Sequence, residues 1–164
     1  MGILKNDKAL RTQLAGFLDW RNAHVGIDAA VKGIPSKLRG AVPNLFEHSI
    51  WELFEHIRIA QHDILDFCRN PRYQAKKWPE EYWPALRGPK SGAAWDKSIA
   101  DFRRDRRSMQ RLAVNRRIDL FGRIPHGSGQ TYIREILLVA DHTAYHVAQI
   151  VDLRRALGVW KPSR

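Results

Sequence analysis

The sequence has 164 residues, of which 44% are hydrophobic and 27% are charged, and this composition is typical of a folded chain rather than a disordered one. Its length predicts one domain over residues 1–164, and its single cysteine, Cys68, excludes an intramolecular disulfide and a thiolate cage for zinc. The formal net charge of +11 suits an anionic partner such as nucleic acid, and equally a solvated basic surface.

The chain shows no sign of a membrane segment. No stretch has the roughly 18 uncharged apolar residues of a membrane span, and residues 1–7 lack the apolar run of a signal peptide. We therefore expect a cytoplasmic protein that has no membrane partner.

Four segments with helical periodicity, separated by breaks rich in proline and glycine, predict an all-α fold, a four-helix up-down-type bundle. The first helix is expected over about residues 7–32, where Gly33 and Pro35 end it. The residues that recur at helical spacing are Leu10, Leu14, Phe17, Leu18, His24, Val25 and Ile27.

The second helix is expected to begin at Asn44, because asparagine is a good N-cap and Glu47 completes an asparagine version of the capping box. Asn70 and Pro71 end it. Its apolar side chains recur at alternating steps of four and three residues, which predicts a seam buried in a bundle. These side chains are Phe46, Ile50, Leu53, Ile57, Ala60, Ile64 and Phe67.

Residues 71–92, which we call the flap, form a long connection between the second and third helices. Such a long connection in a small domain is usually either functional or disordered. Four aromatic residues argue against disorder, and we expect an ordered segment packed over one end of the bundle. They are Tyr73, Trp78, Tyr82 and Trp83.

The third helix, about residues 93–116, carries a series of arginines that are expected to point largely outward: Arg103, Arg104, Arg106, Arg107 and Arg111. They suggest a cationic ridge that binds nucleic acid. The alternative is a solvated face that Asp101 and Asp105 partly neutralise. No helix-turn-helix or aromatic RNA-binding pattern accompanies the arginines, so we favour the solvated face.

The fourth helix, about residues 131–157, places His142 and His146 one turn apart on its inward side. Two imidazoles at this spacing can converge on one divalent metal ion. His56, on the edge of the seam of the second helix, can supply a third nitrogen from a facing helix. Three histidines leave a coordination position open, as in catalytic metal sites. Spacing alone leaves open that these histidines are only hydrogen-bonded in the core.

The remaining candidates have weaker signals. We expect His48 and His62 at the surface or behind the ligands, whereas His24 and His126 are candidates for the border of the site. Cys68 has no activating neighbour in the sequence and is expected to be inert. Further polar candidates are Glu52 and Asp141, which can orient an imidazole or simply be solvated. No Glu-x-x-His pair is present, which argues against a carboxylate di-iron site.

Three runs of the sequence resemble the DinB-like (DinB/YfiT) superfamily. They are HSIWELFEHIRIAQHDILDFCRNPRY in the second helix, WPEEYWP in the flap and TYIREILLVADHTAYHVAQIVDLRRALGVW in the fourth helix. The resemblance implies a four-helix bundle, frequently dimeric, with a divalent metal on His56, His142 and His146. Nickel or zinc is the expected metal, with iron or manganese as further options. Tyr145 and Gln149 belong to the motif without an assigned role.

The resemblance also implies a metal-dependent enzyme that acts on a small molecule. The expected activity is a thiol-dependent S-transferase or isomerase, or a hydrolase, in which the metal activates water or a low-molecular-weight thiol at the open coordination position. In this hypothesis Trp78, Tyr82 and Trp83 exclude water or line the substrate pocket. The alternatives are a basic nucleic-acid-binding module and a bundle whose metal is purely structural.

Overall fold

The computed structural model describes residues 6–20 and 22–161 of the chain. These residues form helices and no strand, apart from one isolated bridge between Arg123 and Thr131. The all-α prediction is confirmed. The α-helices are α1 (Asp7–Phe17), α2 (Ile27–Val31), α3 (Ile50–Arg69), α4 (Gly92–Val114) and α5 (Tyr132–Ala156), and the 3-10 helices are η1 (Ser36–Leu38) and η2 (Glu80–Tyr82).

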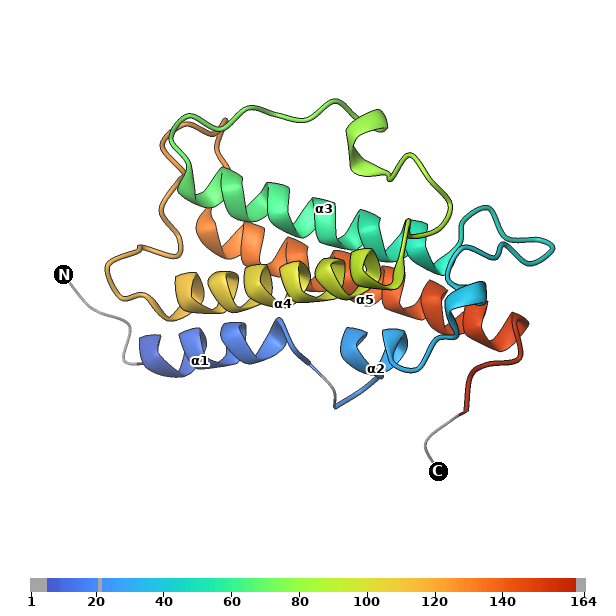
Figure 1. Ribbon diagram of the computed structural model, residues 1–164. Coiled ribbons are helices and arrows are strands. Elements are labelled where there is room, and N and C mark those ends of the chain that lie inside the picture. Colours follow the sequence, from blue (N-terminus) through green and yellow to red (C-terminus); the bar gives the residue numbers. More distant parts are fainter. Residues whose placement is uncertain (1–5, 21, 162–164) are drawn as a thin grey trace.

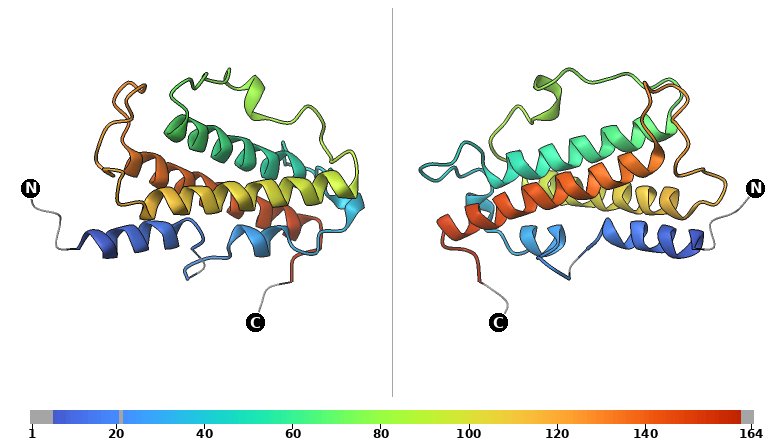
Figure 2. Two further views of the ribbon diagram at one scale, coloured as in Figure 1. Left: turned by 60° about the vertical axis from the view of Figure 1, so that its left-hand side comes forward. Right: turned by 180° about the vertical axis from the view of Figure 1, so that it is seen from behind.

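The long helices lie lengthwise against one another (Figures 1 and 2). The path of the flap determines the relative directions of α3 and α4. The chain leaves the end of α3, runs back along the outer side of this helix through the flap, and enters α4 in the direction of α3. Helices α1 and α5 run the opposite way. The order of directions is therefore up, down, down, up, and the flap covers the length of α3 instead of one end of the bundle.

The continuous helix predicted over residues 7–32 is wrong, because α1 ends at Phe17 and α2 begins at Ile27. The buried guanidinium of Arg106 binds carboxylates on both sides of this break, at 2.9 Å from Asp19 and 2.8 Å from Asp28. Arg106 was expected to point outward, and its burial between two aspartates explains why the chain bends around it. Residue 21 and the N-terminal residues 1–5, which bear on the signal-peptide prediction, lie outside the described residues.

Helix α3 begins five residues later than expected, because Ser49 and not Asn44 is its N-cap. The Ser49 hydroxyl accepts a hydrogen bond from the Glu52 amide at 3.1 Å, and the Glu52 carboxylate accepts one from the Ser49 amide at 2.8 Å. Leu45 has a φ of 70°, which is outside the right-handed helical region. Glu52 is therefore used in capping the helix, not in orienting a histidine.

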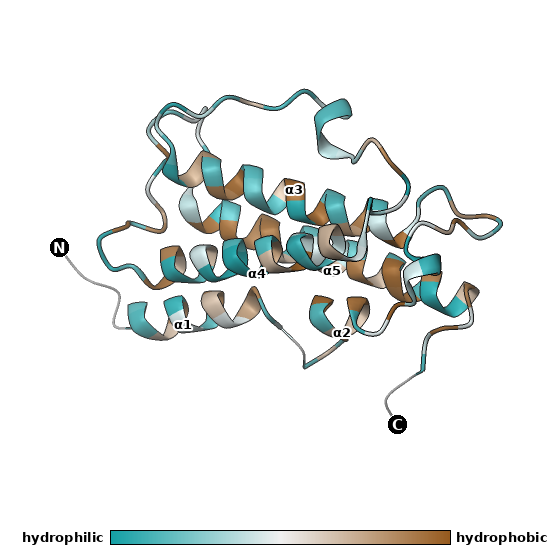
Figure 3. Ribbon diagram, in the orientation of Figure 1, coloured by the Kyte–Doolittle hydropathy of each residue, from teal (hydrophilic) through white to brown (hydrophobic). Residues whose placement is uncertain are grey.

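The core divides into two apolar clusters along the bundle. One surrounds Phe54 and Trp95, and the other surrounds Met109 and Ile136. Apolar and hydrophilic positions alternate along each helix in Figure 3, as expected for helices that bury one face. Within the described part of the chain, no helix combines the length and apolar character needed to cross a membrane.

Candidate metal centre

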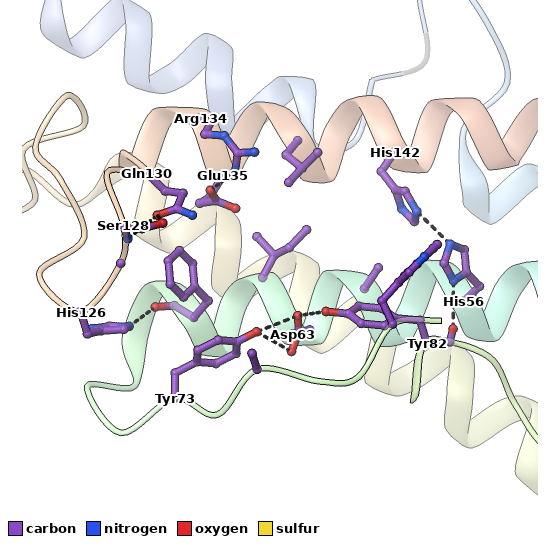
Figure 4. A pocket seen from close by; sticks show the side chains of 17 residues that line it. His56, Asp63, Tyr73, Tyr82, His126, Ser128, Gln130, Arg134, Glu135 and His142 are labelled. Carbon is purple, nitrogen blue, oxygen red and sulfur yellow. Dashed lines mark hydrogen bonds and ion pairs between the residues drawn. The ribbon is translucent and has the colours of Figure 1, made fainter. Parts of the chain in front are cut away.

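The three histidines singled out from the sequence lie together between α3 and α5. His56 comes from the middle of α3, and His142 and His146 come from successive turns of α5. The Nε2 atoms of His56 and His142 are 3.0 Å apart, and Figure 4 shows these two side chains pointing toward each other. One nitrogen of each of the three rings lies within 4.8 Å of the others. The fold thus brings together residues that are far apart in the sequence.

This arrangement fits a metal ion. Two imidazole nitrogens bonded to one ion at 2.0–2.1 Å lie roughly 3–4 Å apart, which is the separation of the His56 and His142 nitrogens. Burial lowers the pKa of all three histidines, and for His142 burial together with the neighbouring His146 and His56 lowers it to about 4. Neutral imidazoles offer the lone pairs that a metal requires. The group can therefore hold a metal ion.

Two of the rings are held by hydrogen bonds through their other nitrogen. Nδ1 of His56 lies 2.9 Å from the main-chain oxygen of Tyr82, and Nδ1 of His146 lies 2.6 Å from the side-chain oxygen of Gln149. When Nδ1 donates its proton to an oxygen, the lone pair is on Nε2. This contact gives Gln149 the role that the sequence motif left open. Asp141 is exposed, in keeping with a solvated carboxylate.

The flap covers His56 with an aromatic side chain. Trp83 lies between two imidazoles, with its ring centroid 4.1 Å from that of His56 and 4.1 Å from that of His48. The planes of Trp83 and His56 differ by only 5°. His48 therefore belongs to the layer behind His56, one of the two places expected for it. The stack and the Tyr82 hydrogen bond together fix the orientation of the His56 ring.

A pocket of about 700 Å³ opens beside the histidines (Figure 4). His56 and His142 line it at one end, and His126 and Ser128 line it near the other. Its apolar lining includes Ile64, Phe67, Trp78 and Leu138. This volume is in the range of small-molecule sites. Trp78 and Tyr82 of the flap line the pocket as expected, whereas Trp83 does not and packs on His56 instead.

Asp63 is a lining residue that sequence reasoning missed. Its side chain is 7% exposed and accepts hydrogen bonds from the phenols of Tyr73, at 3.1 Å, and Tyr82, at 2.6 Å. Burial and the charge of Asp63 raise the pKa of Tyr73 to about 12, and that of Tyr82 is also raised. Both phenols therefore stay protonated as donors. The sequence signal for Asp63 was its spacing of seven residues from His56, which places Asp63 and His56 on one face of α3.

The other polar candidates lie elsewhere or are inert. His126 borders the pocket and lies 2.7 Å from the main-chain oxygen of Phe67. His62 pairs with Asp105 on the α4 side, and His24 is exposed beside a separate, smaller cavity. Burial raises the pKa of Cys68 to about 12, which leaves its thiol protonated, as expected of an inert cysteine.

Carboxylates neutralise part of the expected arginine ridge on α4. Arg103 pairs with Asp28, and Arg104 pairs with Asp101 and Asp105. These pairs agree with the solvated-face interpretation that the sequence favoured, whereas Arg106 is buried and is not part of such a face.

Comparison with known proteins supports the family resemblance. The family model of the DinB superfamily matches residues 21–150, a span that covers most of the chain and contains all three histidines. Comparison with curated proteins and with solved structures gave no match.

Proposed function

This chain belongs to the DinB superfamily, and from this membership and the three convergent imidazoles we propose that it is a metal-dependent enzyme acting on a small molecule. His56, His142 and His146 would hold the metal. The observation that carries the proposal is the 3.0 Å separation of the Nε2 atoms of His56 and His142, beside a pocket large enough for a substrate.

The donor set narrows the choice of metal and of chemistry. Three neutral imidazoles suit zinc and nickel, and they also accept ferrous iron or manganese. A bound divalent ion with an open position supplies Lewis-acid chemistry, which lowers the pKa of water or of a low-molecular-weight thiol. The reaction class that we propose is therefore S-transfer or isomerisation with such a thiol, or hydrolysis.

The surrounding residues prepare the site for this role. Tyr82 and Gln149 hold His56 and His146 with the Nε2 lone pairs available, and Trp83 shields His56 behind the flap. On the flap side, Trp78 and Tyr82 add aromatic side chains to the pocket lining.

Metal analysis of protein purified without chelator tests the proposal. We expect about one divalent ion per chain in the wild type, and loss of the ion in His142→Ala. The matched control is His24→Ala, which removes an exposed histidine outside the site and should keep the ion. A wild type without metal, or a His142→Ala variant with a full complement, would overturn the proposal. The homodimer expected from the family resemblance stays a prediction, which sedimentation analysis can test.

A further inference from the structure

A carboxylate faces the same pocket as the histidines. Asp63 lies seven residues after His56 on α3, two helical turns away, and both residues line the pocket. Two turns correspond to a rise of about 10 Å along the helix. A ligand of six or seven bonds in length can therefore reach from the histidines to Asp63.

The negative charge of Asp63 has no cationic partner in the described part of the chain. Its contacts there are the two phenols of Tyr73 and Tyr82, which donate one proton each. A carboxylate has about four lone-pair positions, so at least two remain for another donor. A buried anion without a countercharge is costly, and a cation at this place would offset that cost.

The rest of the pocket lining favours a cation as well. Glu135 of α5 is 2% exposed and lines the pocket, where its one ion-pair partner among the described residues is the half-exposed Arg134. The charged side chains of the lining are thus two carboxylates and one guanidinium, in a chain of net charge +11. Aromatic rings in the same lining attract cations through their faces. They belong to Phe67, Tyr73, Trp78 and Tyr82.

We propose that the part of the pocket around Asp63 is a subsite for an organic ammonium group, with Asp63 as its counter-ion. The substrate class is then a small molecule with a cationic nitrogen about 10 Å from the atom that sits at the histidines. This inference rests on the proposed function, because it assumes that the other end of the ligand binds at a metal held by the histidines. If Asp63 instead serves only to fasten the flap through its two tyrosines, its charge has no influence on ligand choice.

The test compares three six-carbon thiols that end in an ammonium, a hydroxyl or a carboxylate group. Each is titrated into the cobalt-loaded protein, whose visible spectrum reports a sulfur ligand. We expect the ammonium thiol to bind about tenfold or more tightly than the hydroxyl thiol, as a charge-assisted hydrogen bond allows, and the carboxylate thiol to bind most weakly. Equal affinities of the three thiols for the wild type would overturn the proposal.

Two variants separate the charge of Asp63 from its contact with the flap. Asp63→Asn removes the charge, and should bring the ammonium and hydroxyl thiols to equal affinity. Tyr73→Phe removes one flap contact and leaves the charge, so the preference for the ammonium thiol should persist. Loss of the preference in Tyr73→Phe but not in Asp63→Asn would count against the ammonium subsite.

A metal-free measurement distinguishes failure of this inference from failure of the proposed function. Hexylamine and hexanoate are titrated calorimetrically into the protein in the presence of chelator. Tighter binding of hexylamine, lost in Asp63→Asn, supports the subsite even if the wild type binds no cobalt. Cobalt binding without any preference for the amine retains the metal site and rejects the subsite.

Discussion

The main-chain oxygen of Tyr82 lies 2.9 Å from Nδ1 of His56 and orients a metal-ligand candidate from within the flap. The phenol of the same residue donates to Asp63. One flap residue therefore contacts both His56 and Asp63 of α3, and a displacement of the flap would change the His56 ring and the Asp63 carboxylate together. The flap is thus part of the candidate site and not only its cover.

The corresponding contact on α5 comes from a side chain and can be removed. Gln149→Leu deletes the oxygen that lies 2.6 Å from Nδ1 of His146, and we expect metal affinity to fall by about 10- to 100-fold, as for other partners of metal-bound histidines. Zinc affinity is measured by competition with a chromophoric chelator. Gln149→Glu is the matched control, because it keeps an acceptor at this position. Unchanged affinity in Gln149→Leu would show that this hydrogen bond does not orient His146.

The metal-free protein is expected to lose stability on acidification. Burial and the neighbouring His146 and His56 lower the pKa of His142 from 6.5 to about 4, so the unfolded chain takes up a proton at a pH where the folded protein does not. The contribution of the neutral ring is complete above pH 6.5 and is lost progressively as the pH falls to about 4, below which both states are protonated.

Urea unfolding at a series of pH values, with chelator present, measures this dependence. The free energy of unfolding of His142→Gln should fall less steeply between pH 6.5 and 4 than that of the wild type. The exposed His24 provides the comparison, since His24→Gln should keep the wild-type slope. Parallel curves for the wild type and His142→Gln would contradict the prediction.

The parts of the structure that could be predicted from the sequence are those that depend on local pattern. Helices α4 and α5 lie close to their predicted bounds because their periodicity is uninterrupted, and Gly158 follows the end of α5. His142 and His146 were found from their spacing of one turn, and His56 from its place beside a buried seam. The helical period alone places these residues on the faces of α3 and α5 that meet each other.

The missed features depend on contacts between segments far apart in the sequence. The break after Phe17 forms around Arg106 of α4, which no local signal in the first helix reveals. The start of α3 was misplaced because Asn44 and Ser49 both have glutamate three residues later, and only the structure shows which pair caps the helix. The contact of Tyr82 with His56 uses a main-chain oxygen of the flap. Every residue has such an oxygen, so the sequence gives no signal for this contact.

The Ser49 hydroxyl is expected to stabilise the protein through two hydrogen bonds. Its hydroxyl accepts from the Glu52 amide and donates to the main-chain oxygen of Arg87 at 2.5 Å, so it joins α3 to the end of the flap. Ser49→Ala removes both contacts, and we expect a loss of about 1–2 kcal/mol in the free energy of unfolding. Glu52→Gln keeps an acceptor for the Ser49 amide and should change it little. Urea unfolding distinguishes the two, and equal losses would contradict this assignment.

The flap also packs against the turn that follows η1, through two glycines, Gly88 and Gly40. A Cβ atom on Gly40 would lie 2.9 Å from the Cα atom of Gly88 and 3.0 Å from the main-chain oxygen of Arg87. Both neighbours are backbone atoms, so the clash is relieved only when the flap moves. Gly40→Ala should therefore lower the free energy of unfolding by about 1–3 kcal/mol, as overpacking does, and shift tryptophan fluorescence if the stack of Trp83 on His56 is disturbed.

The matched control for this substitution is Gly16→Ala in α1, where a Cβ atom would meet nothing within 4 Å. Alanine is the better helix former by about 0.5–1 kcal/mol, so the control should be neutral or stabilising. Urea unfolding gives the two free energies, and tryptophan emission is compared in the folded proteins. If Gly40→Ala is as stable as Gly16→Ala and its emission is unchanged, the contact between Gly40 and Gly88 does not hold the flap in place.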